Sequence, residues 1–193
     1  MNIERHLPEL RRAIRNHKYE ETDTGIYLPA QDQILGFSCE TRVNGRDPQL
    51  THNLLTLEGR RYLLGAAVAG TAQVTQFYIA PFTGDVMPLE SWTAANFAAA
   101  ATEFTSYEGS TRVVWNRAMH ATASSADNTA NAAVFTLSAG QSNVTLRGFA
   151  LLTASSKSAT TGALLSAMRH DRPALGEGDA LSVRLTLTYQ NPA

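Results

Sequence analysis

Alternation of hydrophobic and polar positions is the main pattern in the second half of the chain. It is clearest over Leu181–Tyr189, where Leu181, Val183 and Leu185 alternate with Ser182, Arg184 and Thr186. Residues 144–152 repeat the period of two, which is typical of strands with one buried face. Other β-like segments cover residues 34–43, 73–81, 111–119, 132–137 and 162–169. Residues 34–43 end at the turn Asn44-Gly45, and residues 73–81 are apolar on both faces.

Two segments follow a helical period instead. Residues 53–69 carry an apolar face, with Thr56 as a candidate N-cap and Gly70 as the stop. Residues 88–102 are rich in Ala, and we expect Trp92 and Phe97 to anchor them. Residues 121–131 are rich in Ser, Ala, Asn and Asp and predict an exposed loop. Short strands separated by turn signals predict a mainly β fold, an antiparallel β-sandwich or jelly roll with a few short helices.

The first part of the chain has a different character. Residues 7–18 predict a short helix that starts near Pro8 and carries a narrow apolar stripe at helical spacing. The polar stretch Glu20–Gly25 then predicts a linker. We therefore expect an N-terminal helical arm over residues 1–33 and a β-sandwich domain over residues 34–193. The alternative is a helix that packs on its own domain. The candidate subunit-contact residues are Leu7, Leu10, Arg11, Arg12, Ile14 and Arg15.

The amino-acid composition argues against several classes of function. The 193 residues are 44% hydrophobic, which excludes a disordered chain, and the net charge of −1 argues against direct binding of nucleic acid or a membrane. Only Lys18 and Lys157 among the sixteen basic residues are lysines. Arginine is enriched at protein interfaces and lysine is depleted there, although codon bias in a GC-rich genome would give the same ratio. No apolar run of signal-peptide length lies within Met1–Lys18, so we expect assembly in a cytoplasm.

Candidate chemistry is sparse. The histidines have no i, i+4 pair, the chain has no nucleophile elbow and no phosphate loop, and Cys39 is the one cysteine. We expect Cys39 to be a buried structural thiol and Asp179 to belong to a turn rather than a calcium loop. Five carboxylates could meet in space as a glycosidase pair, but no pattern marks two of them: Asp85, Glu90, Glu103, Glu108 and Asp179. We expect no cofactor, no metal and no enzymatic activity.

The order of segments resembles a known group of proteins. The matching patterns are residues 53–65, 76–81, 103–107, 111–115, 162–165 and 178–187, with Trp92 between the second and third. Over roughly residues 50–190 the chain resembles the small structural proteins that tailed bacteriophages encode beside their capsid and tail genes. These include capsid decoration (cement) proteins and head or tail accessory proteins with β-sandwich folds.

This resemblance implies a non-enzymatic virion protein that stabilises the shell by bridging capsid subunits. Its partners would be the major capsid protein and other copies of itself, and it would be located in the virion. The alternative is a tail-fibre or baseplate module that binds host-surface carbohydrate. Such a module would use exposed aromatic and acidic side chains, and the candidates are Trp92, Tyr107 and Asp85.

Overall fold

The computed structural model describes residues 20–22, 25–27, 34–119 and 124–190. The chain divides into two compact units, Met1–Ile34 with Asn191–Ala193, and Leu35–Gln190, here called the body. In the first unit, β1 (Glu20–Thr22) pairs antiparallel with β2 (Gly25–Tyr27). The expected linker over Glu20–Gly25 is therefore wrong, because a two-residue connection lets these polar residues form a tight hairpin. The helix predicted over residues 7–18 lies outside the described residues.

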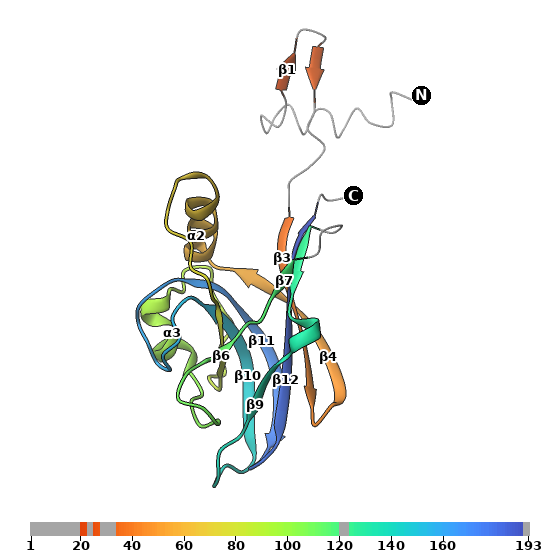
Figure 1. Cartoon of the computed structure of the whole chain (residues 1–193), viewed down its shortest axis with the longest axis vertical. Helices are drawn as coiled ribbons and strands as arrows, with labels where there is room; N and C mark the ends of the chain where they lie inside the picture. Colours follow the sequence, from red (N-terminus) through yellow and green to blue (C-terminus); the bar gives the residue numbers. More distant parts are fainter. Residues whose placement is uncertain (1–19, 23–24, 28–33, 120–123, 191–193) are drawn as a thin grey trace. The chain divides into compact units, whose positions relative to one another are not determined.

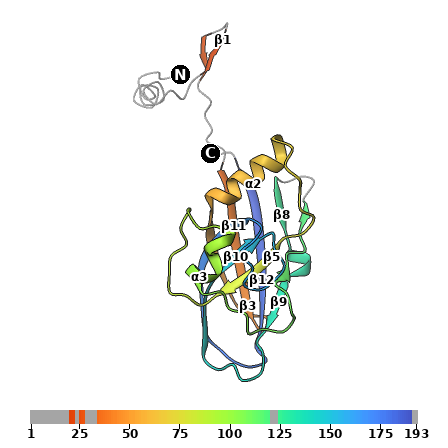
Figure 2. The ribbon, with the colours of Figure 1, turned by 90° about the vertical axis from the view of Figure 1, so that its left-hand side faces the viewer.

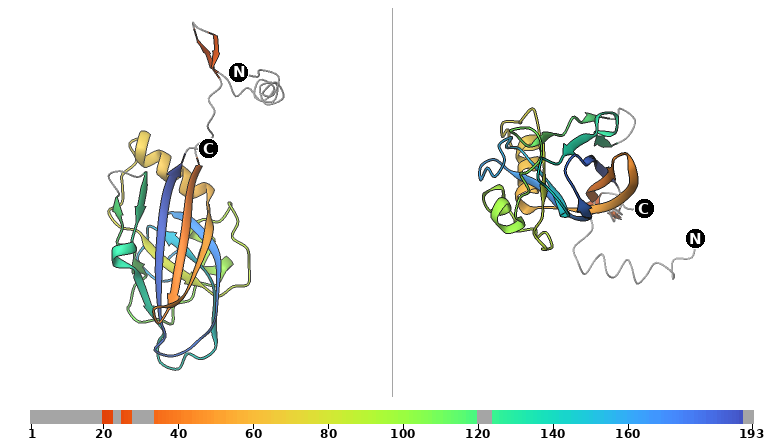
Figure 3. Two further views of the ribbon diagram at one scale, coloured as in Figure 1. Left: turned by 90° about the vertical axis from the view of Figure 1, so that its right-hand side faces the viewer. Right: turned by 90° about the horizontal axis from the view of Figure 1, so that it is seen from below.

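The strands of the body form one antiparallel ladder that folds into two layers. Its order is β6-β5-β10-β11-β4-β3-β12-β8-β7, and β9 also pairs with β12. The strands are β3 (Ile34–Val43), β4 (Arg46–Leu55), β5 (Tyr78–Phe82), β6 (Val113–Val114), β7 (Ala118–Met119), β8 (Ser125–Asp127), β9 (Ala133–Thr136), β10 (Val144–Leu152), β11 (Leu164–Leu175) and β12 (Ala180–Gln190). Figure 3 shows β12, β3 and β4 side by side in the layer that faces the viewer on the left. The mainly β, antiparallel sandwich is confirmed, and the jelly-roll topology stays a prediction.

Both sides of the sandwich are closed. On one side, β4 pairs with β3 over most of its length and with β11 only at its end. On the other side, residues 113–119 pair first with β5 and then with β8. The expected single strand over residues 111–119 is therefore wrong. The interruption covers residues 115–117, where Arg117 N donates to the Trp115 carbonyl at 2.9 Å in a tight turn. The Trp115 indole lies in the core and donates to the Leu185 carbonyl at 3.2 Å.

Turn and cap chemistry sets the ends of several elements. The strand predicted over residues 34–43 matches β3, and the turn that ends it has Asn44 and Gly45 at positive φ of 49° and 75°. The Oγ1 atom of Thr56 accepts a hydrogen bond from Gly59 N, which confirms this N-cap. The helix α2 (Leu57–Val68) begins four residues later than predicted because Asn53–Leu55 continue β4.

The second helix, α3 (Ala94–Ala101), is shorter than the predicted 88–102 segment. Trp92 and Phe97 anchor it as expected. The predicted exposed loop over 121–131 is wrong where it is described, since it contains β8 and a 3-10 turn (Thr129–Asn131). Buried Asn128 explains this, because its amide bonds to the backbone of β12. In the part of the chain described, no helix is long and apolar enough to cross a membrane.

The strand predicted over residues 73–81 begins only at Tyr78, and most of residues 73–76 are exposed, so the first half of that prediction is wrong. The strand β5 itself is buried on both faces as predicted, because it lies between two cores. The inner face of the β5–β10–β11 layer forms the main core with β3, β9 and β12, and it includes Phe37, Ile79 and Phe149. The outer face is covered by α3, which lies beside this layer in Figure 1. Figure 2 shows α2 across the end of the strands, where Gly59 packs on the backbone of Leu165.

Candidate docking surface

A split between β4 and β11 creates a pocket on the body. The two strands pair at Leu55 with Ser166 and at Leu54 with Ala167, and beyond these pairs β4 turns away to join β3. The resulting pocket has a volume of about 450 Å³. Its lining residues are Thr51, His52, Met87, Pro88, Ala167, Met168 and Arg169. We call the facing stretches of β4 and β11 beyond their paired ends the seam.

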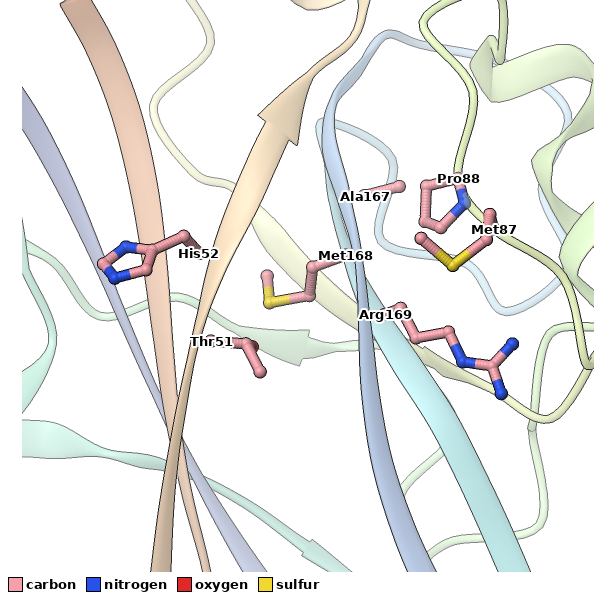
Figure 4. A pocket seen from close by; sticks show the side chains of 7 residues that line it. All are labelled: Thr51, His52, Met87, Pro88, Ala167, Met168 and Arg169. Atoms are coloured by element: carbon pink, nitrogen blue, oxygen red, sulfur yellow. The ribbon is translucent and has the colours of Figure 1, made fainter.

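Figure 4 shows that the pocket has two kinds of wall. The side chains of Ala167 and Arg169 extend toward the loop that carries Met87 and Pro88, while His52 points away from that loop. Strand alternation explains the difference between neighbours on β11: Met168 faces the main core, whereas Ala167 and Arg169 face the other side of the layer, where Ala167 is buried in the second core.

Large apolar side chains are exposed around this pocket. Met87 is 66% exposed, and Leu89, two residues further along the same loop, is 56% exposed. Leu50 is also 62% exposed, but it shares a face of β4 with His52, which points away from that loop. We call Met87 and Leu89 the docking patch. Exposed apolar groups gathered beside a pocket are typical of protein interaction sites.

Four charged side chains border the pocket. Arg169 donates to Asp85 at 2.6 Å and to both carboxylate oxygens of Asp171. Arg147 contacts the same two carboxylates, at 3.2 Å from Asp171 and 3.7 Å from Asp85. These hydrogen bonds to Asp171 and Asp85 raise the pKa of Arg169. The charges of the two arginines and the two aspartates balance, so the rim of the pocket is neutral and its charged groups are paired with one another.

A buried polar network lies under the seam. His170 is 1% exposed, and its Nε2 and Nδ1 lie 2.5 Å from the Thr41 hydroxyl and 2.8 Å from the Thr51 hydroxyl. Arg172, also buried, donates to Thr41 and to the Asp47 carbonyl. Burial and the nearby Arg172 guanidinium lower the pKa of His170 to about 4. The network joins β11 to both β3 and β4.

A second open pocket of about 360 Å³ lies at the opposite edge of the β12 layer. Met119 and Tyr189, which are 77% and 42% exposed, line it with Leu187. This pocket lacks a charged rim, since its remaining lining residues are Ser124, Ser125 and Ala126. Its volume is smaller than that of the pocket beside β4.

The structure contradicts the expected carbohydrate site. Trp92 is 6% exposed and packs against Phe82 and Phe97, and Tyr107 is 2% exposed and packs edge-on against Phe135. Both aromatic rings therefore belong to the core. The loops that cover them could not be placed from the periodicity of the sequence. Asp85 is exposed but is held by arginines at the pocket rim. The three residues therefore do not form one exposed surface.

The other candidate side chains take part in contacts that stabilise the fold. Glu103 pairs with buried Arg112, Glu90 with Arg60, and Asp179 accepts a hydrogen bond from Gly176 N within its turn. Cys39 is buried as expected, and burial raises the pKa of its thiol. The expected contact residues Leu7, Leu10, Arg11, Arg12, Ile14 and Arg15 lie outside the described residues. Within the described ranges, no group of three His, Cys, Asp or Glu side chains could hold a metal ion.

Comparison with known proteins gives no relative. No family model, no curated protein and no solved structure matches the chain. The arguments about function therefore rest on the docking patch, the pocket and the seam.

Sequence reasoning missed the network under the seam. The expected strand ended at Arg169, whereas β11 continues to Leu175 and places His170 and Arg172 on its inner face. Their spacing of two from Met168 is a signal for this placement, because residues that alternate with exposed ones share the buried face. His170 is buried and Asp171 is exposed, because adjacent residues of a strand point to opposite faces.

Proposed function

We propose that the protein is a non-enzymatic structural protein of a tailed-bacteriophage virion, and specifically a capsid decoration protein that bridges neighbouring capsid subunits. The observation that carries this proposal is the docking patch beside the pocket of β4 and β11. Two large apolar side chains of one loop, Met87 and Leu89, are more than half exposed there, on a body whose other large apolar side chains mostly fill two cores.

The closed sandwich supports association through side chains. Free strand edges pair readily with other chains, but here β4 closes one side of the sandwich and residues 113–119 close the other. Pro48 in β4 and Pro173 in β11 also lack the N–H that a further strand would need. Contact with a partner is therefore best made by an apolar surface such as the docking patch.

Bridging requires a second contact surface. The sequence supplies one in the apolar stripe of Leu7, Leu10 and Ile14, which is too small to stabilise a lone helix of about twelve residues in water. In this proposal the docking patch rests on one capsid subunit, and the arm binds an adjacent subunit or a second copy. The protein then stabilises the shell by contact area, without catalysis.

Two double variants test the two surfaces. Undecorated capsids are mixed with wild type, with M87D/L89D or with L10D/I14D, and co-sedimentation is measured. Burial of each apolar side chain contributes roughly 1.5–3 kcal/mol, so we expect each double variant to weaken binding by about tenfold or more. V134D is the matched control, because Val134 is 50% exposed on β9 and lies outside the docking patch.

Each outcome bears on the proposal. Weakened binding by both double variants, with V134D unchanged, supports a bridge with two surfaces. Undiminished binding by M87D/L89D would show that the docking patch does not attach the body. Wild-type protein that fails to bind capsids but binds host cells would favour a host-recognition role.

A further inference from the structure

The seam is held closed by side chains. Backbone pairing between β4 and β11 covers two residue pairs, after which the strands diverge by joining different layers. Further along, His170 and Arg172 of β11 reach across to Thr51 and the Asp47 carbonyl of β4, and to Thr41 of β3. This side of the sandwich therefore depends on two titratable or charged side chains.

The hydrogen bonds fit a neutral His170. Arg172 Nε donates to the Thr41 hydroxyl at 2.7 Å, so this oxygen already accepts one hydrogen bond. Its own proton is then free to be donated to His170 Nε2 at 2.5 Å. We therefore assign the ring proton to the other nitrogen, Nδ1, which lies 2.8 Å from the Thr51 hydroxyl and donates to it in this tautomer. With one acceptor and one donor nitrogen on the imidazole, the side chains of His170, Thr41 and Thr51 all have compatible hydrogen-bond partners.

A second proton on His170 would disturb this arrangement. It would place an N–H on Nε2, where the Thr41 proton now points, and a second positive charge beside Arg172. The surroundings supply little compensation. Phe149 of β10 packs against the ring with centroids 5.9 Å apart, and Cys39 of β3 is a neutral thiol. The Asp171 carboxylate, which acts to raise the pKa of His170, lies on the outer face and pairs with Arg147 and Arg169. The Asp47 carboxylate of β4 acts on Arg172 instead.

We propose that the seam is an acid-sensitive latch, in which protonation of His170 breaks its bond to Thr41 of β3 and lets β11 part from the paired strands β3 and β4 at the pocket. The lowered pKa of His170, about 4 against 6.5 for an open state, agrees with this geometry. Because the pKa is lower in the closed state, closure is fully favoured above pH 6.5 and is lost as the pH falls toward 4. The inference concerns the body alone and does not depend on the proposed function.

Cys39 provides a built-in reporter. It is the chain's one cysteine, is 0% exposed and lies on β3 beside the network. Full-length protein is treated with 2,2′-dithiodipyridine, which reacts with thiols in acid, and each rate is divided by that of the unfolded chain. The pKa difference predicts that the normalised rate rises on the order of 100-fold between about pH 7 and pH 4. In H170Q, whose amide keeps polar atoms but does not titrate, we expect a change of less than about threefold.

H52Q is the matched control, because His52 lies on β4 with its side chain exposed and should leave the wild-type profile intact. A rise of the same size in H170Q, or a flat wild-type profile, would overturn the proposal. If H170Q does not fold, H170N replaces it, and hydrogen exchange of the wild type gives an independent test. Acid should then accelerate exchange, corrected for its intrinsic rate, in β4 and β11 more than in the paired strands β9 and β12. Uniform acceleration over all four strands would overturn the latch.

Discussion

Replacement of Glu103 by Ala should be among the most damaging single changes in the body. Glu103 and Arg112 form a two-point ion pair, with Nε–Oε1 and Nη2–Oε2 distances of 2.8 and 2.7 Å. Their side chains are 1% and 0% exposed. Arg112 also donates to the Ala154 carbonyl, and Glu103 accepts from Ser158 N. The pair therefore fastens the β10–β11 connection to the segment that follows α3.

The size of the expected stability loss follows from the Arg112 charge that E103A leaves without a partner. In E103A the Arg112 guanidinium keeps its position without a carboxylate, and an uncompensated buried charge costs about 3–5 kcal/mol. That is a large fraction of a typical stability of about 5–15 kcal/mol. The control is E90A, which removes a salt bridge to Arg60 between side chains that are 58% and 44% exposed. Exposed pairs of this kind contribute about 0–1 kcal/mol.

Urea unfolding followed by circular dichroism gives the free energy of unfolding of each variant. We expect E103A to lose several times more stability than E90A. The double variant E103A/R112M should recover part of the loss, because it removes the stranded charge as well. A loss below about 1 kcal/mol in E103A, equal to that in E90A, would refute the reasoning. It would mean that Arg112 finds water or another partner when Glu103 is absent.

Two further substitutions probe the packing of the two cores. G148A should destabilise the body by roughly 3 kcal/mol, because a Cβ atom there would lie 1.9 Å from the Met168 carbonyl oxygen and 2.3 Å from the Phe82 ring. A thermal unfolding midpoint within a degree or so of that of the wild type would contradict this prediction. Y107F should be neutral or stabilising by about 1 kcal/mol, because the buried Tyr107 hydroxyl has no hydrogen-bond partner in the structure, and a clear loss in chemical denaturation would reveal a missed partner.

Local patterns were enough to predict much of the sandwich. The bounds of β3 and β10 agree with their predictions, and β12 extends the predicted segment by one residue at each end. Each has strong alternation or ends at a turn whose residues favour positive φ, such as Asn44-Gly45. These signals lie within a few residues of the element that they define, so no tertiary information was needed.

The parts that sequence reasoning missed depend on distant partners. The first half of β4 contains Pro48 and polar residues, and it is a strand because β3 pairs with it through a two-residue turn. The inward position of His170 becomes favourable only when Thr41 and Thr51, more than a hundred residues earlier, supply its hydrogen bonds. Tyr107 and Trp92 looked like exposed loop aromatics because nothing local shows which segments cover them. The pocket is equally non-local, since its lining joins β4 and β11 to the loop before α3.

The number of copies per particle tests the central claim most directly. In the proposed function the chain is encoded by a tailed phage, so virions of that phage are purified and quantitative mass spectrometry compares this protein with the major capsid protein. A decoration protein should be present in hundreds of copies per particle, in a fixed ratio to the capsid protein. A few tens of copies or fewer, or absence from the virion, would contradict a role in bridging capsid subunits.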